Sequence, residues 1–235
     1  MDSYNRMIRG MEKASTRTER LAEVMVELVA EGGLEALSVR AVAQRGDVSI
    51  GTVQYHFPTK EAMLGQAFRQ VVGRVSQRAL ATQEQDPVSR LVGTLHQLLP
   101  LDDERLVEAR VVMAFSAAAA VHPGLAAVQE EVLRDVLAAL ARCFAQDRGA
   151  TTTNAQDQTR ARVALATTDG LALHAISAPG TLSRRELSAC VDELVSGLIS
   201  GPVSGPVSGP VRTPTPDPLG DETGRTGRGD APGGQ

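Results

Sequence analysis

Hydrophobic residues recur at intervals of three and four along most of this chain, which is the spacing of one face of an α-helix. The clearest such faces lie within residues 21–29, 125–144 and 187–199. No segment shows the alternation of apolar and polar residues that predicts a strand. We therefore predict an all-α fold of about nine helices, over residues 16–31, 39–45, 50–56, 59–85, 87–99, 104–121, 125–146, 156–177 and 184–199.

Capping residues and helix breakers set the expected helix ends. Thr16-x-x-Glu19 and Ser183-x-x-Glu186 both fit the capping box, in which a hydroxyl and a carboxylate satisfy free backbone N–H groups. These local signals divide the hydrophobic pattern into separate helices. Further helix ends are expected at Gly32-Gly33, Asp86-Pro87, His122-Pro123-Gly124 and Pro179-Gly180.

The stretch 38–64 has the pattern of two short helices joined by a tight turn. Ser38 stands where an N-cap would, and apolar residues then mark one face of a short helix. Gly46 and Asp47 interrupt that face, and both residue types tolerate the left-handed backbone that such a turn requires. Ser49 caps a second short helix. Two helices across a short turn form the unit that lays its second helix in the major groove of DNA.

This stretch resembles the DNA-binding signature of the tetracycline-repressor (TetR) family of transcriptional regulators. The resemblance implies a three-helix head, residues 16–60, that binds double-stranded DNA. Two positions depart from the signature, since Asp47 stands where the family usually has glycine and Gln54 where it usually has tyrosine. The matching positions are Val42, Ala43, Val48, Ser49, Gly51, Thr52, Val53, Tyr55, His56, Phe57, Lys60, Glu61 and Leu64.

The second short helix presents the side chains expected to read DNA bases. Gln54 can pair bidentately with adenine, Ile50 can touch a thymine methyl group, and Gly51 lets the backbone approach closely. The family resemblance implies that other positions here contact phosphates or bases. The predicted DNA-binding residues are Ser38, Arg40, Ser49, Ile50, Gly51, Thr52, Gln54, Tyr55, His56 and Lys60.

Charge is balanced in the head, so composition alone does not indicate DNA binding. The chain has a net charge of −4, with 8 basic and 8 acidic residues in 1–60 and 16 and 20 in 61–235. Glutamates at positions 19, 23, 27 and 31 form a single stripe on the first helix, because they are spaced by four. This stripe must face away from any bound DNA.

The reactive residue types form no catalytic or metal-binding pattern. Cys143 and Cys190 lack disulfide or metal spacing and are expected to be small core residues. The four histidines are scattered, so a helical enzyme is the weaker alternative, and no cofactor is expected. No apolar run approaches the ~20 residues of a membrane span, and no secretory signal opens the chain. We expect a cytoplasmic protein with no membrane partner.

Composition divides the rest of the chain into three further parts. Residues 1–15 are expected to be a flexible arm, since they are polar and charged. Residues 61–199 are expected to form a helical effector-binding and dimerisation domain. From residue 200 the sequence repeats SGPV three times and stays rich in proline and glycine, which predicts a disordered tail to residue 235.

The second domain resembles the choline-responsive (BetI-type) subgroup of the TetR family, through Ala114-Phe115 and the segment 168–171. The resemblance implies an effector cavity among the middle helices and a dimer formed by the last two. Only Phe115 and Phe144 are aromatic beyond residue 68, so a cage for a quaternary ammonium is poorly supplied and a largely apolar effector fits better. The candidate cavity residues are Leu95, Leu98, Arg110, Met113, Phe115, Phe144, Thr168 and His174.

The final helix independently favours a homodimer. It has a strongly apolar face opposite polar residues, as a helix that packs on a partner requires, although an ordinary core helix has the same pattern. The predicted dimer residues are Leu187, Val191, Leu194, Val195 and Leu198.

Together these features predict a dimeric, ligand-responsive transcriptional regulator that binds a palindromic operator, most simply a repressor. A small-molecule effector would move the 59–85 helix and change the separation of the two recognition helices. An activator of the same family is one alternative. A helical interaction scaffold without DNA binding is another.

Overall fold

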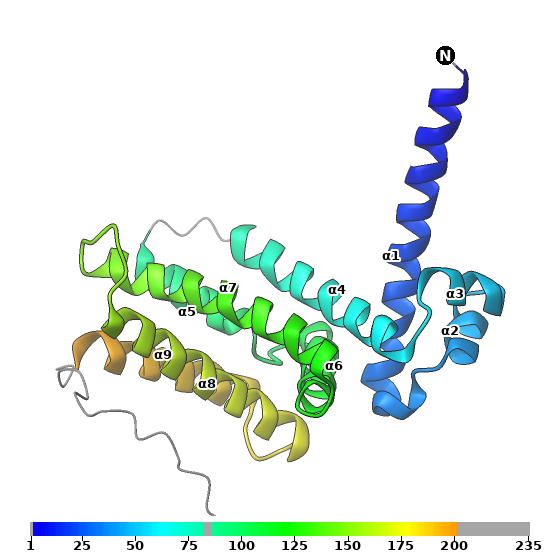
Figure 1. Ribbon diagram of the computed structural model, residues 1–235. Helices are drawn as coiled ribbons and strands as arrows, with labels where there is room; N and C mark the ends of the chain where they lie inside the picture. The colour runs from blue at the N-terminus through cyan, green and yellow to red at the C-terminus, as the bar shows by residue number, and fades with distance from the viewer. Residues whose placement is uncertain (1, 82–85, 202–235) are drawn as a thin grey trace, which may run out of the picture. The chain divides into compact units, whose positions relative to one another are not determined.

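The computed structural model describes residues 2–81 and 86–201, and of residues 2–16 it describes the backbone alone. Within these ranges the chain forms nine helices and no strand, which confirms the predicted all-α fold (Figure 1). The helices are α1 (Asp2–Ala36), α2 (Val39–Arg45), α3 (Ile50–His56), α4 (Lys60–Ala81), α5 (Pro87–Gln97), α6 (Asp103–Ala119), α7 (Pro123–Asp147), α8 (Ala155–Ser177) and α9 (Arg184–Ser200).

The first helix is longer than the sequence predicts. α1 begins at Asp2, so the predicted helix start at Thr16 is wrong. The flexibility of the arm, residues 1–15, stays a prediction. The capping-box pattern at Thr16 does not mark a helix start, because the helix continues through it. No proline precedes Thr16 to interrupt the backbone hydrogen bonding. The predicted break at Gly32-Gly33 is confirmed, since Gly33 has φ 64° and ψ −160° and a short helical turn follows.

Side-chain caps hold the starts of the later helices. Ser183 and Glu186 form the predicted capping box of α9, and the predicted N-cap Asp86 accepts a backbone hydrogen bond at the start of α5. Asn154 and Asp157 form another capping box that opens α8 at Ala155, one residue before the predicted start. An Asn followed three residues later by Asp is the acidic variant of the same local signal, so this start was readable from the sequence.

The described helices bury two apolar cores. The first joins α1, α2 and α3 to α4, α6 and the start of α7. Within it Phe68 of α4 stacks on Phe115 of α6, with ring centroids 3.9 Å apart and ring planes 5° from parallel. The second core lies among α5, α7, α8 and α9. The first core therefore continues across residue 60 and ties the three-helix head to the α4–α6 pair.

Some expected boundaries extend beyond the described residues. α4 is described to Ala81, so its expected end at residue 85 lies outside that range. The expected tail begins inside α9, because Ser200 is the last residue of this helix and Gly201 is its C-cap. The remainder of the expected tail, residues 202–235, lies outside the described residues. The domain limits at residues 16–60 and 61–199 stay predictions.

Candidate nucleic-acid interface and effector cavity

Two serine caps fix the starts of the helices in the α2–α3 unit, as the sequence predicts. Ser38 Oγ accepts a hydrogen bond from the Ala41 backbone N–H at 3.2 Å, and Ser49 Oγ accepts one from the Thr52 N–H at 3.0 Å. Val53 is fully buried beneath α3. Because this one residue anchors the short helix to the core, most of its other side chains face outward.

The turn between α2 and α3 uses Gly46 and Asp47 for different reasons. Asp47 has φ 52°, a left-handed conformation that aspartate tolerates, as predicted. Gly46 has φ −79°, so the prediction of a left-handed backbone at this position is wrong. A Cβ atom at Gly46 would lie 2.8 Å from Leu21 Cδ2 and 2.9 Å from the carbonyl oxygen of Val42. The end of the Leu21 side chain can move aside but the Val42 carbonyl is backbone, so the close approach of this carbonyl favours glycine here.

All the predicted DNA-binding residues lie at the surface. Ile50 and Tyr55 are large hydrophobic side chains with exposed fractions of 50% and 84%, so neither stabilises the core of the chain. Gln54 is exposed on the same helix. An exposed row of this kind is suited to base edges and methyl groups in a DNA groove. Thr52 and His56 are half-buried, and the exposed remainder are Ser38, Arg40, Ser49, Gly51 and Lys60.

The acidic stripe of α1 is partly neutralised by arginines that the sequence analysis did not pair with it. Glu31 Oε2 lies 2.8 Å from Arg45 Nη1, at the end of α2. Glu23 forms an ion pair with Arg74 of α4. These ion pairs hold α2 and α4 against α1. They also reduce the repulsion between the acidic stripe and DNA phosphates.

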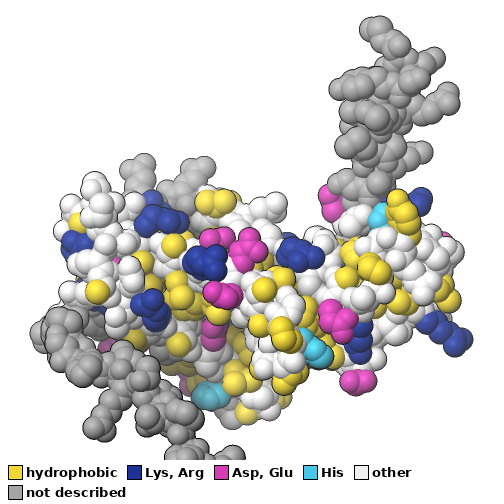
Figure 2. All heavy atoms as spheres, viewed as in Figure 1, with side chains coloured by type: hydrophobic (Ala, Val, Ile, Leu, Met, Phe, Trp, Pro, Cys, Tyr) yellow, Lys and Arg dark blue, Asp and Glu magenta, His cyan; other side chains and the backbone are white. Residues whose placement is uncertain are grey.

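Two cations of the head are available to phosphates. Arg40 of α2 and Lys60, the first residue of α4, form no ion pair within the part of the chain that the structure describes. Lys60 adds its charge to the N-terminal end of α4, where free backbone N–H groups favour an anion. Figure 2 shows acidic and basic side chains interspersed over the visible face. Because residues 1–60 carry as many acidic as basic residues, we expect DNA binding to depend on individually placed cations instead of a broad basic field.

A chain of ion pairs runs from α1 through α4 to α6. Arg74 pairs with Glu23 of α1, and its Nη1 also lies 4.0 Å from Glu108 Oε1 of α6. Arg78, one turn further along α4, donates to both carboxylate oxygens of Glu108. Glu108 is only 2% exposed, so these arginines neutralise a carboxylate that has been removed from water.

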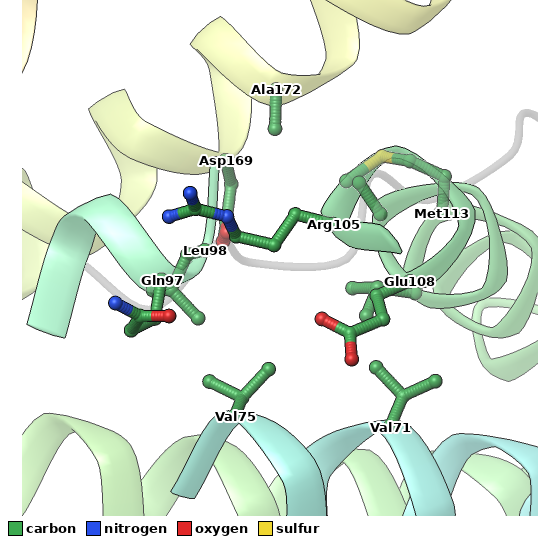
Figure 3. A pocket seen from close by; sticks show the side chains of 11 residues that line it. Val71, Val75, Gln97, Leu98, Arg105, Glu108, Met113, Asp169 and Ala172 are labelled. Atoms are coloured by element: carbon green, nitrogen blue, oxygen red, sulfur yellow. The ribbon is translucent and has the colours of Figure 1, made fainter. Parts of the chain in front are cut away.

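A cavity of two lobes lies among α4, α6, α7 and α8 and the end of α5, and we call it the central cavity. The lobes enclose about 110 Å³ and about 40 Å³. Figure 3 shows Val71 and Val75 of α4 on one side of the smaller lobe and Asp169 of α8 on the other. Space of this size holds a small molecule or several waters. Both lobes are lined by Val71, Val75, Leu98, Val112, Met113 and Asp169.

Asp169 is a partly buried carboxyl group in these largely apolar surroundings. Burial raises its pKa to about 6 from the ordinary value of 3.8. No other described residue forms an ion pair or a hydrogen bond with its carboxylate. The ionised side chain is therefore unfavourable in this position.

Replacing Asp169 with asparagine should stabilise the folded protein above pH 6. The unfolded chain releases the Asp169 proton near pH 3.8 and the folded chain near pH 6, so stability falls as the pH rises through this interval. The substitution should raise the free energy of unfolding by roughly 2–3 kcal/mol at about pH 7.5, and by less as the pH falls toward 4. Urea unfolding at several pH values measures this gain. A gain that does not change with pH would contradict the assignment.

The predicted cavity residues fall into three groups. Leu98 and Met113 line both lobes of the central cavity. Arg110 and His174 are exposed, and the structure does not bring them to this cavity. Asp169 is not among the predicted cavity residues, although it lines both lobes and belongs to the segment that carries the BetI-type resemblance. The residues that are buried in the cores instead are Leu95, Phe115, Phe144 and Thr168.

Helix α9 has two apolar sides, which changes the predicted dimer surface. Leu187, Val191 and Val195 are buried in the core of their own chain, so they present almost no surface to a partner, and their role in a dimer stays a prediction. Leu194 and Leu198 line a shallow groove on the outer side of α9. The groove is also lined by Ala189, Cys190 and Gly197, and Cys190 is exposed there instead of lying in the core as predicted.

One side-chain cluster brings together the residue types of a catalytic triad. His96 Nε2 of α5 lies 3.0 Å from Asp192 Oδ1 and 3.2 Å from Ser188 Oγ, both of α9. A triad needs the serine and the aspartate on different ring nitrogens, whereas here both share Nε2. The cluster therefore links α5 to α9 without the geometry of a nucleophile and base. Among the described residues we find no group of three metal-ligating side chains and no helix long and apolar enough to span a membrane.

Comparisons with known proteins agree with both parts of this architecture. Residues 22–67 match the bacterial regulatory proteins of the tetR family, and residues 87–200 match the C-terminal domain of BetI-type transcriptional repressors. A transcriptional regulator from Rhodococcus sp. RHA1 is 38% identical and has a TM-score of 0.72, and the match covers 80% of this chain and 99% of that one.

Other relatives match more distantly or over a shorter length. The repressor KstR of Mycolicibacterium smegmatis is 34% identical over 46% of this chain and 57% of its own length. The regulator PksA of Bacillus subtilis is 25% identical over 74% of this chain and 86% of its own length. A regulator from Saccharomonospora viridis, solved in complex with choline, is 20% identical with a TM-score of 0.68, covering 77% of this chain and 96% of that one, which shows the fold alone.

The α2–α3 unit and the helical domain behind it are therefore the two parts of a DNA-binding transcriptional regulator, not of an enzyme. The chain belongs to the TetR family, with a C-terminal domain of the BetI type.

Proposed function

We propose that two copies of this chain bind a palindromic operator in the cytoplasm as a repressor, and that a small, largely apolar effector in the central cavity releases them. The observation that carries this proposal is the double role of α4. Its first residue, Lys60, lies at the surface intended for DNA, while Val71 and Val75 of the same helix line the cavity. A ligand that displaces α4 would therefore act directly on the head.

Release requires only a small movement of the head. The recognition helices of a dimer must match half-sites that lie ~34–36 Å apart on one face of DNA. An effector that binds better to the altered spacing than to the DNA-bound spacing shifts the population toward the released form. A movement of α4 would disturb the contacts of Arg74, because this residue forms ion pairs with both Glu23 of α1 and Glu108 of α6.

The choline seen in the Saccharomonospora viridis regulator is not the effector that we propose for this chain. The lining of the central cavity includes a single aromatic side chain, Phe68, and no tyrosine or tryptophan. One face of Phe68 is covered by Phe115. Recognition of a quaternary ammonium by surrounding aromatic faces is therefore poorly supported.

Substitutions in the head should separate base reading from phosphate binding. Gln54→Ala should lower discrimination between bases at one base-pair position by about 1–3 kcal/mol and leave discrimination at the other positions nearly unchanged. Lys60→Ala should weaken binding to every sequence alike and reduce the slope of log affinity against log salt by about 1. Gel-shift titrations against a set of single-base operator variants at several salt concentrations measure both effects. Equal loss of specificity in the two variants would contradict the assignment.

The outer groove of α9 is the surface that we propose for the dimer. Its lining is mostly apolar, although Glu186 and Glu193 also belong to it, and the exposed hydrophobic residues Val163 and Leu173 lie on the neighbouring helix α8. A two-helix surface that packs on its own copy forms a four-helix contact around a two-fold axis. This proposal keeps Leu194 and Leu198 from the predicted set.

Leu194→Arg should convert the dimer to a monomer, because it places a charge in the middle of an apolar contact. Ser196→Arg is the matched control, since it adds the same charge to α9 at an exposed position that does not line the groove. Sedimentation velocity at micromolar concentration distinguishes the two forms. An unchanged dimer in Leu194→Arg would place the interface elsewhere.

A further inference from the structure

The charged side chains that line the central cavity are already paired, with one exception. Glu108 is held by Arg78, which donates to both of its oxygens. Arg105 Nε donates to Asp102 Oδ2 at 2.8 Å, and its Nη1 donates to the carbonyl oxygen of His96 at 3.1 Å. Within the described part of the chain, the exception is Asp169, which lines both lobes and has no ion pair or hydrogen bond. The lining therefore carries an uncompensated negative charge when Asp169 is ionised.

A second polar group in the larger lobe also lacks a partner. The side-chain oxygen Oε1 of Gln129, on α7, is buried without any hydrogen bond in the structure. Buried polar atoms are nearly always hydrogen-bonded, so an acceptor without a protein partner at a cavity wall is free to accept a hydrogen bond from a bound ligand or a water. Asp169 and Gln129 thus present the same requirement, because a carboxylate and an amide oxygen both accept hydrogen bonds.

The rest of the larger lobe is apolar, apart from the hydroxyl groups of Ser76 and Ser116. Its walls include Val72, Val132 and Leu133, which favour a hydrocarbon body. The shortage of aromatic faces disfavours a head group without N–H donors. The unpaired acceptors instead suit a protonated amine, whose N–H groups can each reach an oxygen.

We propose that the effector is an amphipathic amine, with its hydrocarbon chain among the valines and leucines and its ammonium group donating to Asp169 and Gln129. This inference rests on the proposed function, because it names the chemical class of ligand for the same cavity. It would explain why an unfavourable lone carboxylate occupies an apolar site, since the ligand supplies the missing positive charge.

The test uses four small probes that share a six-carbon chain: hexylamine, 1-hexanol, hexanoate and hexyltrimethylammonium. Their binding to the full-length protein is measured by calorimetry at about pH 7.5, where an alkylamine is protonated like a lysine side chain. Hexylamine should bind at least about tenfold more tightly than hexanol, because hydrogen bonds between charged groups are stronger than neutral ones. Hexanoate should bind least, and the trimethylammonium probe should bind more weakly than the amine.

Substitution of Asp169 tests the contribution of its charge while the shape of the cavity stays nearly the same. Asp169→Asn should remove most of the tenfold preference for hexylamine and change hexanol binding by less than about threefold. Asp135→Asn, which removes an exposed carboxylate of α7 outside the cavity, is the matched control and should keep the preference.

The proposal is overturned if hexanol or hexanoate binds as tightly as hexylamine, if Asp169→Asn keeps the preference, or if none of the probes binds. Operator binding is measured separately by gel shift. An amine that binds the cavity without changing DNA affinity would uphold the ligand class and refute the proposed release mechanism. Absence of DNA binding by the unliganded wild-type protein would refute the proposed function, whatever the cavity binds.

Discussion

Replacing Glu108 with alanine should lower the free energy of unfolding by about 3–5 kcal/mol, which is the usual cost of leaving one member of a buried ion pair without its partner. Glu108 is 2% exposed and accepts hydrogen bonds from both Nη1 and Nη2 of Arg78. Its removal takes the nearest carboxylate away from Arg78, which keeps Glu104 at 3.5 Å, and it breaks one of the two ion pairs that Arg74 forms among the described residues. The contact between α4 and α6 should therefore weaken at the place where the cavity and the head meet.

Urea unfolding at a fixed protein concentration measures this effect, because the proposed dimer would make apparent stability depend on concentration. Glu104→Ala is the matched control. Glu104 lies 3.5 Å from the same arginine, but it is well exposed on the same helix, so its loss should change stability little. Equal effects of the two substitutions would show that burial of Glu108 does not determine its contribution.

Phe68→Ala should lower the free energy of unfolding by a similar amount, about 3–5 kcal/mol. Phe68 is 2% exposed, and the substitution removes both its burial and its stacking on Phe115. Because this pair joins α4 to α6 inside the first core, the packing of the three-helix head against α4 and α6 should weaken as well. Operator affinity should fall together with stability.

The matched control for Phe68→Ala is Leu80→Ala, on the same helix. Leu80 is 84% exposed, so its truncation should change stability by no more than about 0.5 kcal/mol. Calorimetric melting of both variants, followed by gel shift, gives the two readouts. A Phe68→Ala variant as stable as Leu80→Ala would mean that the α4–α6 junction does not depend on the stacked rings.

The sequence was sufficient for features that depend on neighbouring residues. Ser38 and Ser49 are caps because their hydroxyl groups reach backbone N–H groups three residues ahead, and that geometry is local. Asp47 takes its left-handed conformation for an equally local reason. Gly46 shows the limit of such reasoning, since its constraint is the close approach of the Leu21 side chain and the Val42 carbonyl oxygen, which the sequence pattern does not reveal.

Features that depend on contacts between distant residues were not predictable in this way. Periodicity shows that α9 has an apolar face, but only packing reveals that Val191 faces its own core while Leu194 lies in the outer groove. The ion pairs of Glu23 and Glu108 join helices far apart in the chain, so no spacing indicates them. Asp169 likewise became a candidate only when its surroundings were known to lack a counter-charge.

The central claim is that the α2–α3 unit of a symmetric dimer finds DNA, and footprinting tests it most directly. Full-length protein is incubated at low salt with the DNA upstream of its own gene and of the flanking genes, and protection from DNase is mapped. We expect two protected half-sites related by two-fold symmetry, with centres about one helical turn or a multiple of it apart. The Lys60→Ala variant should require a higher protein concentration for the same protection. Absence of protection throughout this DNA at low salt would contradict the account.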